Sequence, residues 1–331
     1  MRAAVLTGQH RWRVDEVPDP RPGPGEVLIR TEVAAICGSD VHAAGEPAGA
    51  RLGGWAPGAP GHEAVGVVLD SRSPAFAPGQ RVLCTPPAAT ARCFAELQVL
   101  PPSALVGLPD GLPAATLVLA QQLGTAIFAM KRFWPAGAGA GRSAAVLGTG
   151  PAGLAFVQLL HRAGFAPILA SDTAPSRLAL ARAFGAHTVV HAPGEDALPV
   201  ALDLTGGAGV DLAIEAAGRD VTRHQAMRMV ALDGRIGLFG LEERAGLSSY
   251  PLAEVFRRRP TIEMVWGAQF ETGLASMHAA ADLVAADPGP AQRLLSHRLG
   301  LDEIGTAFDL ARDPGSGAVK VVIELVRSAR G

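Results

Sequence analysis

The chain has 331 residues, of which 48% are hydrophobic and 18% are charged, and its formal net charge is -2. This length predicts about two domains, and the apolar content indicates packed cores rather than a disordered chain. The near-neutral charge argues against binding of nucleic acid or of a membrane surface by electrostatics. Three cysteines exclude a disulfide scaffold and a four-cysteine zinc knot, and they fit a reducing compartment.

In the N-terminal sequence MRAAVLTGQHRWRVDEV the apolar residues end after the sixth position and charged residues follow, so we expect no secretory signal. Two long uncharged stretches, 111–130 and 143–160, contain Pro, Gly or Gln at several positions. They are interpreted as buried core rather than membrane spans. We therefore predict a soluble, cytoplasmic protein.

Short β-type segments bounded by Pro and Gly dominate the first ~115 residues, and no long helical period separates them. These segments are residues 3–6, 26–36, 63–70, 81–84 and 94–100. Their pattern predicts a small, mostly antiparallel β domain.

Beyond this region, apolar strands alternate with stretches of helical length such as 150–163 and 174–184. Six strands are predicted, at 144–148, 167–171, 187–191, 210–214, 235–240 and 261–265. This alternation is typical of a parallel sheet covered by helices on both faces, and six strands fit the dinucleotide-binding arrangement. Two helices, 271–286 and 301–312, and a strand at 318–325 follow.

A glycine-rich turn lies between the first of these strands and its helix. The motif reads Gly148-Thr-Gly150-Pro-Ala-Gly153, and such glycines let phosphate oxygens approach a helix N-terminus. The next strand ends at Asp172, where an acidic side chain binds the adenosine ribose and repels a 2′-phosphate. The sequence thus favours NAD, while Arg177 nearby leaves NADP open as an alternative.

Two other nucleotide-dependent chemistries are excluded by residue type. The sequence contains no GxxxxGK[ST] loop, since neither Lys131 nor Lys320 follows that pattern. The single tyrosine, Tyr250, has no lysine four residues later, so a Tyr/Lys proton-donating pair is absent.

A second cluster of reactive residues lies in the β domain, where Cys37-Gly-Ser39-Asp40-Val-His42 precedes the segment GHEAVG that contains His62 and Glu63. A thiolate, an imidazole and carboxylates together are ligands that zinc prefers, and an open position lets the metal act as a Lewis acid. Taken singly, each residue has an ordinary interpretation, because a cysteine after an apolar run is usually buried core and a His-Glu pair is usually surface. The combination is what indicates a metal site.

These motifs, CGSDVH and GHEAVG, together with the nucleotide fingerprint and the tail GAVKVVIEL, resemble the medium-chain dehydrogenase/reductase superfamily in its zinc-dependent alcohol and polyol dehydrogenase branch. The resemblance covers essentially the whole chain. It implies an α/β fold in which a Rossmann doubly wound parallel sheet is inserted in a mostly β, co-chaperonin-like catalytic domain. The catalytic domain would comprise residues 1–121 and 268–331, and the dinucleotide-binding domain residues 122–267.

The resemblance also implies roles for individual residues. Cys37 and His62 would be zinc ligands, and Glu63 would be a carboxylate that approaches or binds the metal. Asp40 would fix the orientation of His62, as metal-bound imidazoles usually require. Ser39 would hydrogen-bond the substrate oxygen.

Two further roles complete the implied site. His42 would pass the substrate proton to solvent through the nicotinamide ribose, and Thr125 would lie against the nicotinamide ring. Zinc would lower the pKa of the alcohol, and the hydride would move to NAD.

The chain departs from the family pattern at two places. Gln121 occupies the position of the third protein ligand, where a neutral amide binds zinc more weakly than a carboxylate or thiolate, so Glu63 or a water is expected to complete the shell. The four-cysteine lobe that holds a structural zinc is missing, and Cys84 and Cys93 flank the point of deletion. We therefore expect one catalytic zinc ion and no structural zinc.

The sequence thus predicts an NAD(P)-dependent, zinc-assisted oxidoreductase that interconverts a secondary alcohol, polyol or sugar-like substrate and its ketone. Two alternatives stay open, a zinc-free quinone or enoyl reductase of the same superfamily and a non-catalytic nucleotide-binding relative. The strand at 261–265 would be a sheet edge, and because an exposed edge favours a partner, we expect a homodimer.

Overall fold

The computed structural model describes residues 1–46, 54–242 and 246–326, and the chain divides into two compact units. Unit 1 comprises Met1–Thr125 and Ala268–Gly331, and unit 2 comprises Ala126–Gly267. The chain therefore passes from unit 1 to unit 2 between residues 125 and 126, four residues beyond the predicted boundary at 121/122. The helix α3 (Leu119–Phe133) continues through both positions, so the sequence has no loop or breaker there that would mark a boundary.

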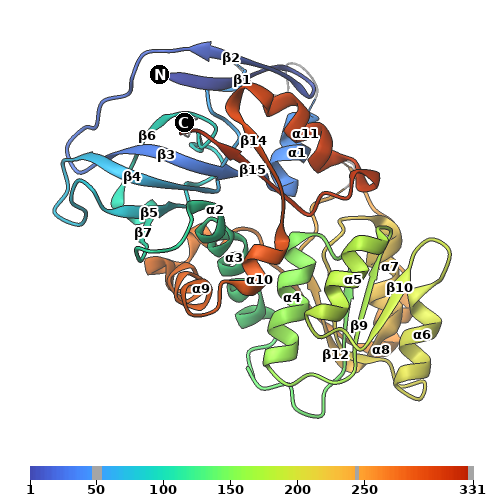
Figure 1. Cartoon of the computed structure of the whole chain (residues 1–331). Coiled ribbons are helices and arrows are strands. Elements are labelled where there is room, and N and C mark those ends of the chain that lie inside the picture. The colour runs from blue at the N-terminus through green and yellow to red at the C-terminus, as the bar shows by residue number, and fades with distance from the viewer. Residues whose placement is uncertain (47–53, 243–245, 327–331) are drawn as a thin grey trace. The chain divides into compact units, whose positions relative to one another are not determined.

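Unit 1 is built on a seven-stranded sheet in the order β14-β15-β3-β4-β5-β7, with β6 also paired to β3 (Figure 1). Neighbouring strands are antiparallel except β14 and β15, which are parallel. The strands are β3 (Val27–Ala35), β4 (Ala64–Ser71), β5 (Arg81–Cys84), β6 (Leu97–Leu100), β7 (Leu105–Gly107), β14 (Leu295–Gly300) and β15 (Lys320–Glu324).

A two-stranded hairpin and several helices complete unit 1. The hairpin joins β1 (Arg2–Gly8) and β2 (Arg11–Glu16). The helices are α1 (Gly38–Ala44), α2 (Ala114–Leu117), the first part of α3, α9 (Ala275–Ala286), α10 (Gly289–Leu294) and α11 (Ile304–Arg312). Sequence patterning does not indicate β2 or β14, because the segments RWRVDE and LSHRLG carry charges that hide their strand character.

The core of unit 1 gathers the inward side chains of the sheet around an aromatic cluster. The ring of Trp12 packs on Phe308 with centroids 4.4 Å apart, and Phe94 meets both rings edge-on. Edge-to-face packing of this kind suits the ring quadrupoles. Since Phe94 and Phe308 are fully buried and come from distant parts of the chain, the cluster ties the C-terminal helix α11 to the N-terminal strands.

Unit 2 is a six-stranded, entirely parallel sheet in the order β10-β9-β8-β11-β12-β13, which confirms the predicted doubly wound arrangement. Its strands are β8 (Ala144–Leu147), β9 (Ile168–Asp172), β10 (Thr188–His191), β11 (Val210–Glu215), β12 (Val230–Leu238) and β13 (Thr261–Met264). Its helices, besides the end of α3, are α4 (Pro151–Arg162), α5 (Pro175–Ala183), α6 (Ala197–Leu204), α7 (Asp220–Met229) and α8 (Leu252–Arg258).

The interior strands β8 and β9 of unit 2 are buried along their whole length rather than at alternate residues. All four residues of β8 are buried, and so are all five of β9. A strand buried on both faces needs helices above and below it, and the crossover helices of a parallel sheet supply them. This is why the run of apolar strands alternating with helices in the sequence folds as one sheet.

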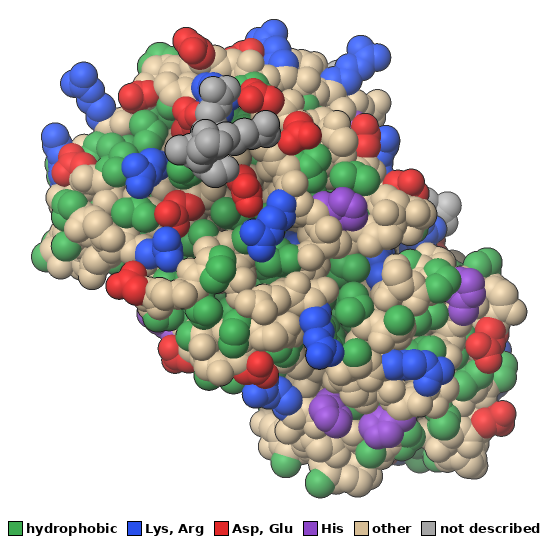
Figure 2. All heavy atoms as spheres, in the orientation of Figure 1, with side chains coloured by type: hydrophobic (Ala, Val, Ile, Leu, Met, Phe, Trp, Pro, Cys, Tyr) green, Lys and Arg blue, Asp and Glu red, His purple; other side chains and the backbone are tan. Residues whose placement is uncertain are grey.

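Among the described residues, no helix is both long and apolar enough to cross a lipid bilayer. On the part of unit 1 that is visible in Figure 2, basic and acidic side chains interleave rather than form a patch of one sign. This distribution agrees with the small net charge of the chain.

Candidate metal and dinucleotide sites

The first site begins where β3 ends. Cys37 has extended backbone angles and is the N-cap of α1, and the Asp40 carboxylate accepts a hydrogen bond from the Cys37 backbone N–H at 2.9 Å. Cys37 and Asp40 thus form a capping box, which fixes the start of the helix. The sequence CGSD therefore places the cysteine thiol at a rigid corner.

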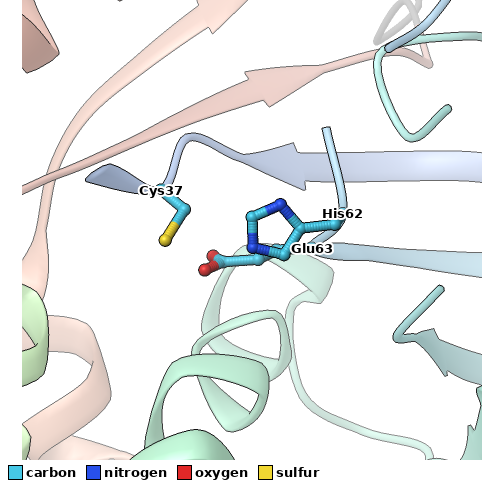
Figure 3. Close-up of side chains that lie close together, drawn as sticks. All are labelled: Cys37, His62 and Glu63. Carbon is cyan, nitrogen blue, oxygen red and sulfur yellow. The ribbon is translucent and has the colours of Figure 1, made fainter. Parts of the chain in front are cut away.

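The second half of the site precedes β4. The Ala35 N–H donates to the Glu63 carbonyl oxygen at 2.9 Å, so the strand that leads to Cys37 lies beside the segment that holds His62 and Glu63. The ligand atoms of Cys37, His62 and Glu63 all lie within 4.8 Å of one another. Figure 3 shows the Glu63 carboxylate turned toward the Cys37 sulfur, with the imidazole of His62 beside it.

The Asp40 carboxylate sets the orientation of His62. Its Oδ1 lies 2.8 Å from His62 Nδ1, and Asp40 is fully buried. This contact leaves Nε2 for a metal, which is the arrangement that metal-binding imidazoles commonly have. Burial lowers the pKa of His62, but the negative charges of Asp40 and Cys37 outweigh it and hold that pKa well above its usual value. The negative groups beside His62 therefore favour a positive charge at this position.

Lys320 is a member of this site that the sequence interpretation misses. Its Nζ lies 2.5 Å from Glu63 Oε2, and both side chains are 0% exposed. β15 brings it there, because Ile36 N–H donates to the Val321 carbonyl oxygen at 3.0 Å. A signal was present in the sequence, since one of only two lysines sits in the apolar run AVKVVIEL. A buried lysine in a strand requires an anionic partner.

The donors present fit a zinc ion. A thiol, an imidazole and a carboxylate converge, and Glu63 Oε1 is buried without a hydrogen-bond partner while Oε2 lies against Lys320. Within the described ranges, this is the one group of three or more His, Cys, Asp or Glu side chains with converging ligand atoms. Cys84 and Cys93 are free and fully buried, and burial raises the pKa of both thiols, so neither offers a thiolate readily.

The other predicted members of this site lie on two helices. Ser39 is half-buried and His42 is exposed on α1, three residues apart and therefore on one face. Gln121 and Thr125 are buried on α3, where the Thr125 hydroxyl donates to the Gln121 carbonyl oxygen at 3.1 Å. Zinc ligation by Gln121 and proton relay through Ser39 and His42 stay predictions.

The second site lies at the start of α4 in unit 2. Gly148 follows β8 with a φ of +91°, and a Cβ on Gly153 would lie 1.9 Å from the Gly148 carbonyl oxygen. Both positions therefore require glycine. Gly150 is the N-cap of α4 and has no side-chain cap, so the first N–H groups of a 12-residue helix are available to an anion.

Asp172 ends β9 beside this loop. Its carboxylate accepts hydrogen bonds from the Thr149 N–H at 2.6 Å and from the Ala174 N–H at 2.9 Å. Arg177 lies half-buried in the first turn of α5. The glycine loop, the open helix N-terminus and this acidic residue form the site that binds a dinucleotide in such sheets.

The chain is similar to known dehydrogenases along nearly its whole length. Residues 23–123 match the family model of the alcohol dehydrogenase GroES-like domain, and residues 151–286 match that of the zinc-binding dehydrogenases. L-threonine 3-dehydrogenase of Bacillus velezensis is 30% identical, over 93% of this chain and 94% of the relative.

Solved structures share the fold. The alcohol dehydrogenase TADH from Thermus sp. ATN1 is 27% identical with a TM-score of 0.86, covering 98% of this chain and 100% of that one. The 2R,3R-butanediol dehydrogenase from Bacillus subtilis has a TM-score of 0.84 at 24% identity, covering 98% and 99%.

The fold has two units, one with a group of converging thiol, imidazole and carboxylate side chains and the other with a glycine-rich loop at the start of α4. The chain belongs to the zinc-binding alcohol dehydrogenase branch of the medium-chain dehydrogenase/reductase superfamily, and it is an alcohol-type oxidoreductase.

Proposed function

We propose that the protein uses one zinc ion and NAD to oxidise a secondary alcohol or polyol to the ketone, and to catalyse the reverse reduction. The observation that carries this proposal is the convergence of Cys37, His62 and Glu63 within 4.8 Å around an imidazole that Asp40 orients. A quinone or enoyl reductase without zinc has no need of this thiol, imidazole and carboxylate set.

The chain's own residues would divide the work at the reacting alcohol. Cys37 and His62 hold the metal, with Glu63 and Gln121 as the remaining candidate donors. Bound zinc supplies Lewis acidity, which lowers the pKa of the substrate hydroxyl.

The proton and the hydride would leave the alcohol by separate routes. The Ser39 hydroxyl accepts the substrate proton, and His42, exposed on the same helix face, releases it to solvent. A bound NAD⁺ would supply the hydride acceptor, so that alcohol and NAD⁺ would give ketone, NADH and a proton.

The preference for NAD is supported by Asp172, because a carboxylate at the end of β9 repels a 2′-phosphate. Replacement of Asp172 by Ala should lower kcat/KM with NAD by about tenfold or more, while kcat/KM with NADP should stay equal or rise. An equal loss with both cofactors would instead indicate that Asp172 only stabilises the loop through Thr149 and Ala174.

The substrate class is supported by the relatives. The hydroxyl oxidised by an L-threonine 3-dehydrogenase is a secondary alcohol, and this enzyme type aligns with nearly the whole chain. A secondary alcohol is accordingly the first substrate class to test.

A homodimer is part of the proposal. β13 is the edge of the sheet in unit 2, and large apolar side chains near it are exposed, Phe256 at 80%, Met264 at 69% and Trp266 at 68%. An edge strand flanked by apolar side chains is a typical surface for a second copy. A cytoplasmic location is supported by the free thiols of all three cysteines.

The experiment that tests the function is a screen of secondary alcohols, polyols and their ketones with NAD(H) and NADP(H), before and after chelation, with zinc measured in each sample. Turnover that disappears with the metal and returns with added zinc supports the proposal. Full activity at less than about 0.2 zinc per chain would contradict the zinc mechanism and favour the zinc-free reductase. NADH binding without turnover on any substrate would favour the non-catalytic relative.

A further inference from the structure

The side chains of the candidate zinc site can carry charges of both signs. Cys37, Asp40 and Glu63 can carry a negative charge there, and Lys320 and His62 can carry a positive one. A metal-bound imidazole is neutral and a metal-bound thiol is ionised, so with zinc in place Lys320 would be the one positive side chain against three negative ones. A divalent cation would neutralise the two remaining negative charges. Gln121, at the third-ligand position of the family pattern, adds no charge to this balance.

Glu63 is paired with Lys320 and lies beside Cys37 and His62, the two side chains that would hold the metal. Its Oε2 lies 2.5 Å from Lys320 Nζ in a region where both side chains are 0% exposed. A carboxylate paired with a buried ammonium group donates less charge to a metal than a free carboxylate does. Weak coordination of zinc by Glu63 would leave one coordination position free, and a catalytic zinc needs such a position for the substrate.

We propose that Lys320 is the positioning residue that holds the Glu63 carboxylate away from permanent zinc coordination and sets the charge of the zinc site. The inference rests on the zinc site of the proposed function. A purely structural lysine would only pair with a buried carboxylate, and its removal would weaken zinc binding. The proposed role predicts the opposite change in zinc affinity. If the lysine is removed, zinc binding becomes tighter rather than weaker.

The physical reason is that removal of a fixed positive charge leaves a more anionic pocket. A unit charge a few ångströms from the metal, at the effective dielectric constant typical of protein sites, changes cation affinity by at least about tenfold. The Lys320→Met variant should therefore bind zinc at least about tenfold more tightly than the wild type. Its kcat should fall, because Glu63 then occupies the substrate position.

The experiment measures the zinc dissociation constant of the purified full-length chain by competition with a chromogenic chelator, and the visible spectrum of the cobalt(II)-substituted protein. Lys320→Met should raise the affinity and change the cobalt d–d bands toward a carboxylate-coordinated pattern. Lys320→Arg, which keeps the charge, should resemble the wild type. The matched control is Lys131→Met, at the other lysine of the chain, which is exposed. It should change neither measurement.

Two further variants keep the test valid if Lys320→Met does not fold. Glu63→Gln leaves the lysine without its partner and should weaken zinc binding about tenfold or more. The double variant Lys320→Met/Glu63→Gln has the wild-type net charge and should bind zinc within about threefold of the wild type. Replacement of a buried ion pair by neutral residues of similar size is often tolerated by the fold.

Zinc binding by Lys320→Met that is unchanged or weaker overturns the inference, and so does a double variant as weak as Glu63→Gln. These results leave the proposed function intact as long as the wild type binds one zinc ion. A wild-type chain that binds no zinc overturns both the inference and the zinc mechanism.

Discussion

The two units prepare their binding sites with different parts of the polypeptide. In unit 1 the site consists of side chains, in which a thiol, an imidazole and a carboxylate converge over a buried lysine. In unit 2 the site consists mainly of backbone, because Gly148 and Gly150 leave the N–H groups of α4 open. The first site should therefore depend on which functional groups are present, whereas the second should depend on how much space a residue occupies.

The largest effect is expected where a functional group is lost from unit 1. Cys37→Ala removes the softest zinc ligand, so zinc should fall below about 0.1 per chain and kcat/KM should fall at least about 1000-fold. The NADH dissociation constant should stay within about threefold of the wild type. Metal analysis, steady-state kinetics and fluorescence titration with NADH check these outcomes.

Cys84→Ala is the control for this variant, because Cys84 is a buried thiol of the same unit outside the converging group. It should keep its zinc and its activity and lose only the stability of a small core truncation, about 1 kcal/mol. Zinc retained by Cys37→Ala would contradict the assignment of the metal site.

The reciprocal experiment adds volume to unit 2. Gly153→Ala places a methyl group 1.9 Å from the Gly148 carbonyl oxygen, so the loop must shift. Overpacking of this kind costs about 1–3 kcal/mol, and NADH binding should weaken about tenfold or more while the zinc content is unchanged. Calorimetric titration with NADH and metal analysis provide the two readouts.

Gly305→Ala is the matched control, since a Cβ at that position in α11 meets nothing within 4 Å. It should leave NADH binding unchanged and slightly stabilise the helix. Wild-type NADH affinity in Gly153→Ala would show that the volume argument does not govern the dinucleotide site.

The smallest effect concerns Glu215 in unit 2, a buried carboxylate that is held by hydrogen-bond donors and the charge of Arg223 rather than by a buried lysine. Glu215 is fully buried, its Oε1 accepts from the Ala217 and Gly218 N–H groups and the Thr222 hydroxyl, and Oε2 has no hydrogen-bond partner. Burial raises the pKa of Glu215 above its usual value. Ionisation therefore destabilises the folded state, and this cost is absent below the pKa of the unfolded chain.

Glu215→Gln keeps an oxygen for the three donors and removes the charge. The stability difference in favour of the variant should grow as pH rises from the usual Glu pKa through the raised one, and should reach roughly 1 kcal/mol near neutral pH. Urea unfolding from pH 4 to pH 8 measures it, with the exposed Glu16→Gln as control. A difference that does not vary with pH would exclude a destabilising charge at Glu215.

Most of the dinucleotide unit was predictable because its signals are local. Gly148, Gly150 and Gly153 stand next to the strand and helix that they join, and apolar strands alternate with helices in chain order. The predicted strand 261–265 corresponds to β13, at the edge of the sheet. By contrast, the boundary between the two units inside α3 has no signal in the sequence, because a continuous helix contains no breaker residue.

The motifs CGSD and Gly148-Thr-Gly150-Pro-Ala-Gly153 could be recognised from the sequence alone, because each acts over a few neighbouring residues. The hydrogen bond from the Cys37 N–H to Asp40 was not predicted. The surroundings of Glu63, in contrast, depend on contacts between distant parts of the chain. The pairing of β15 with β3 carries Lys320 from the end of the chain to a carboxylate that precedes β4. Long-range strand pairing sets such a contact, and burial makes the resulting charge balance strong enough to matter for the metal.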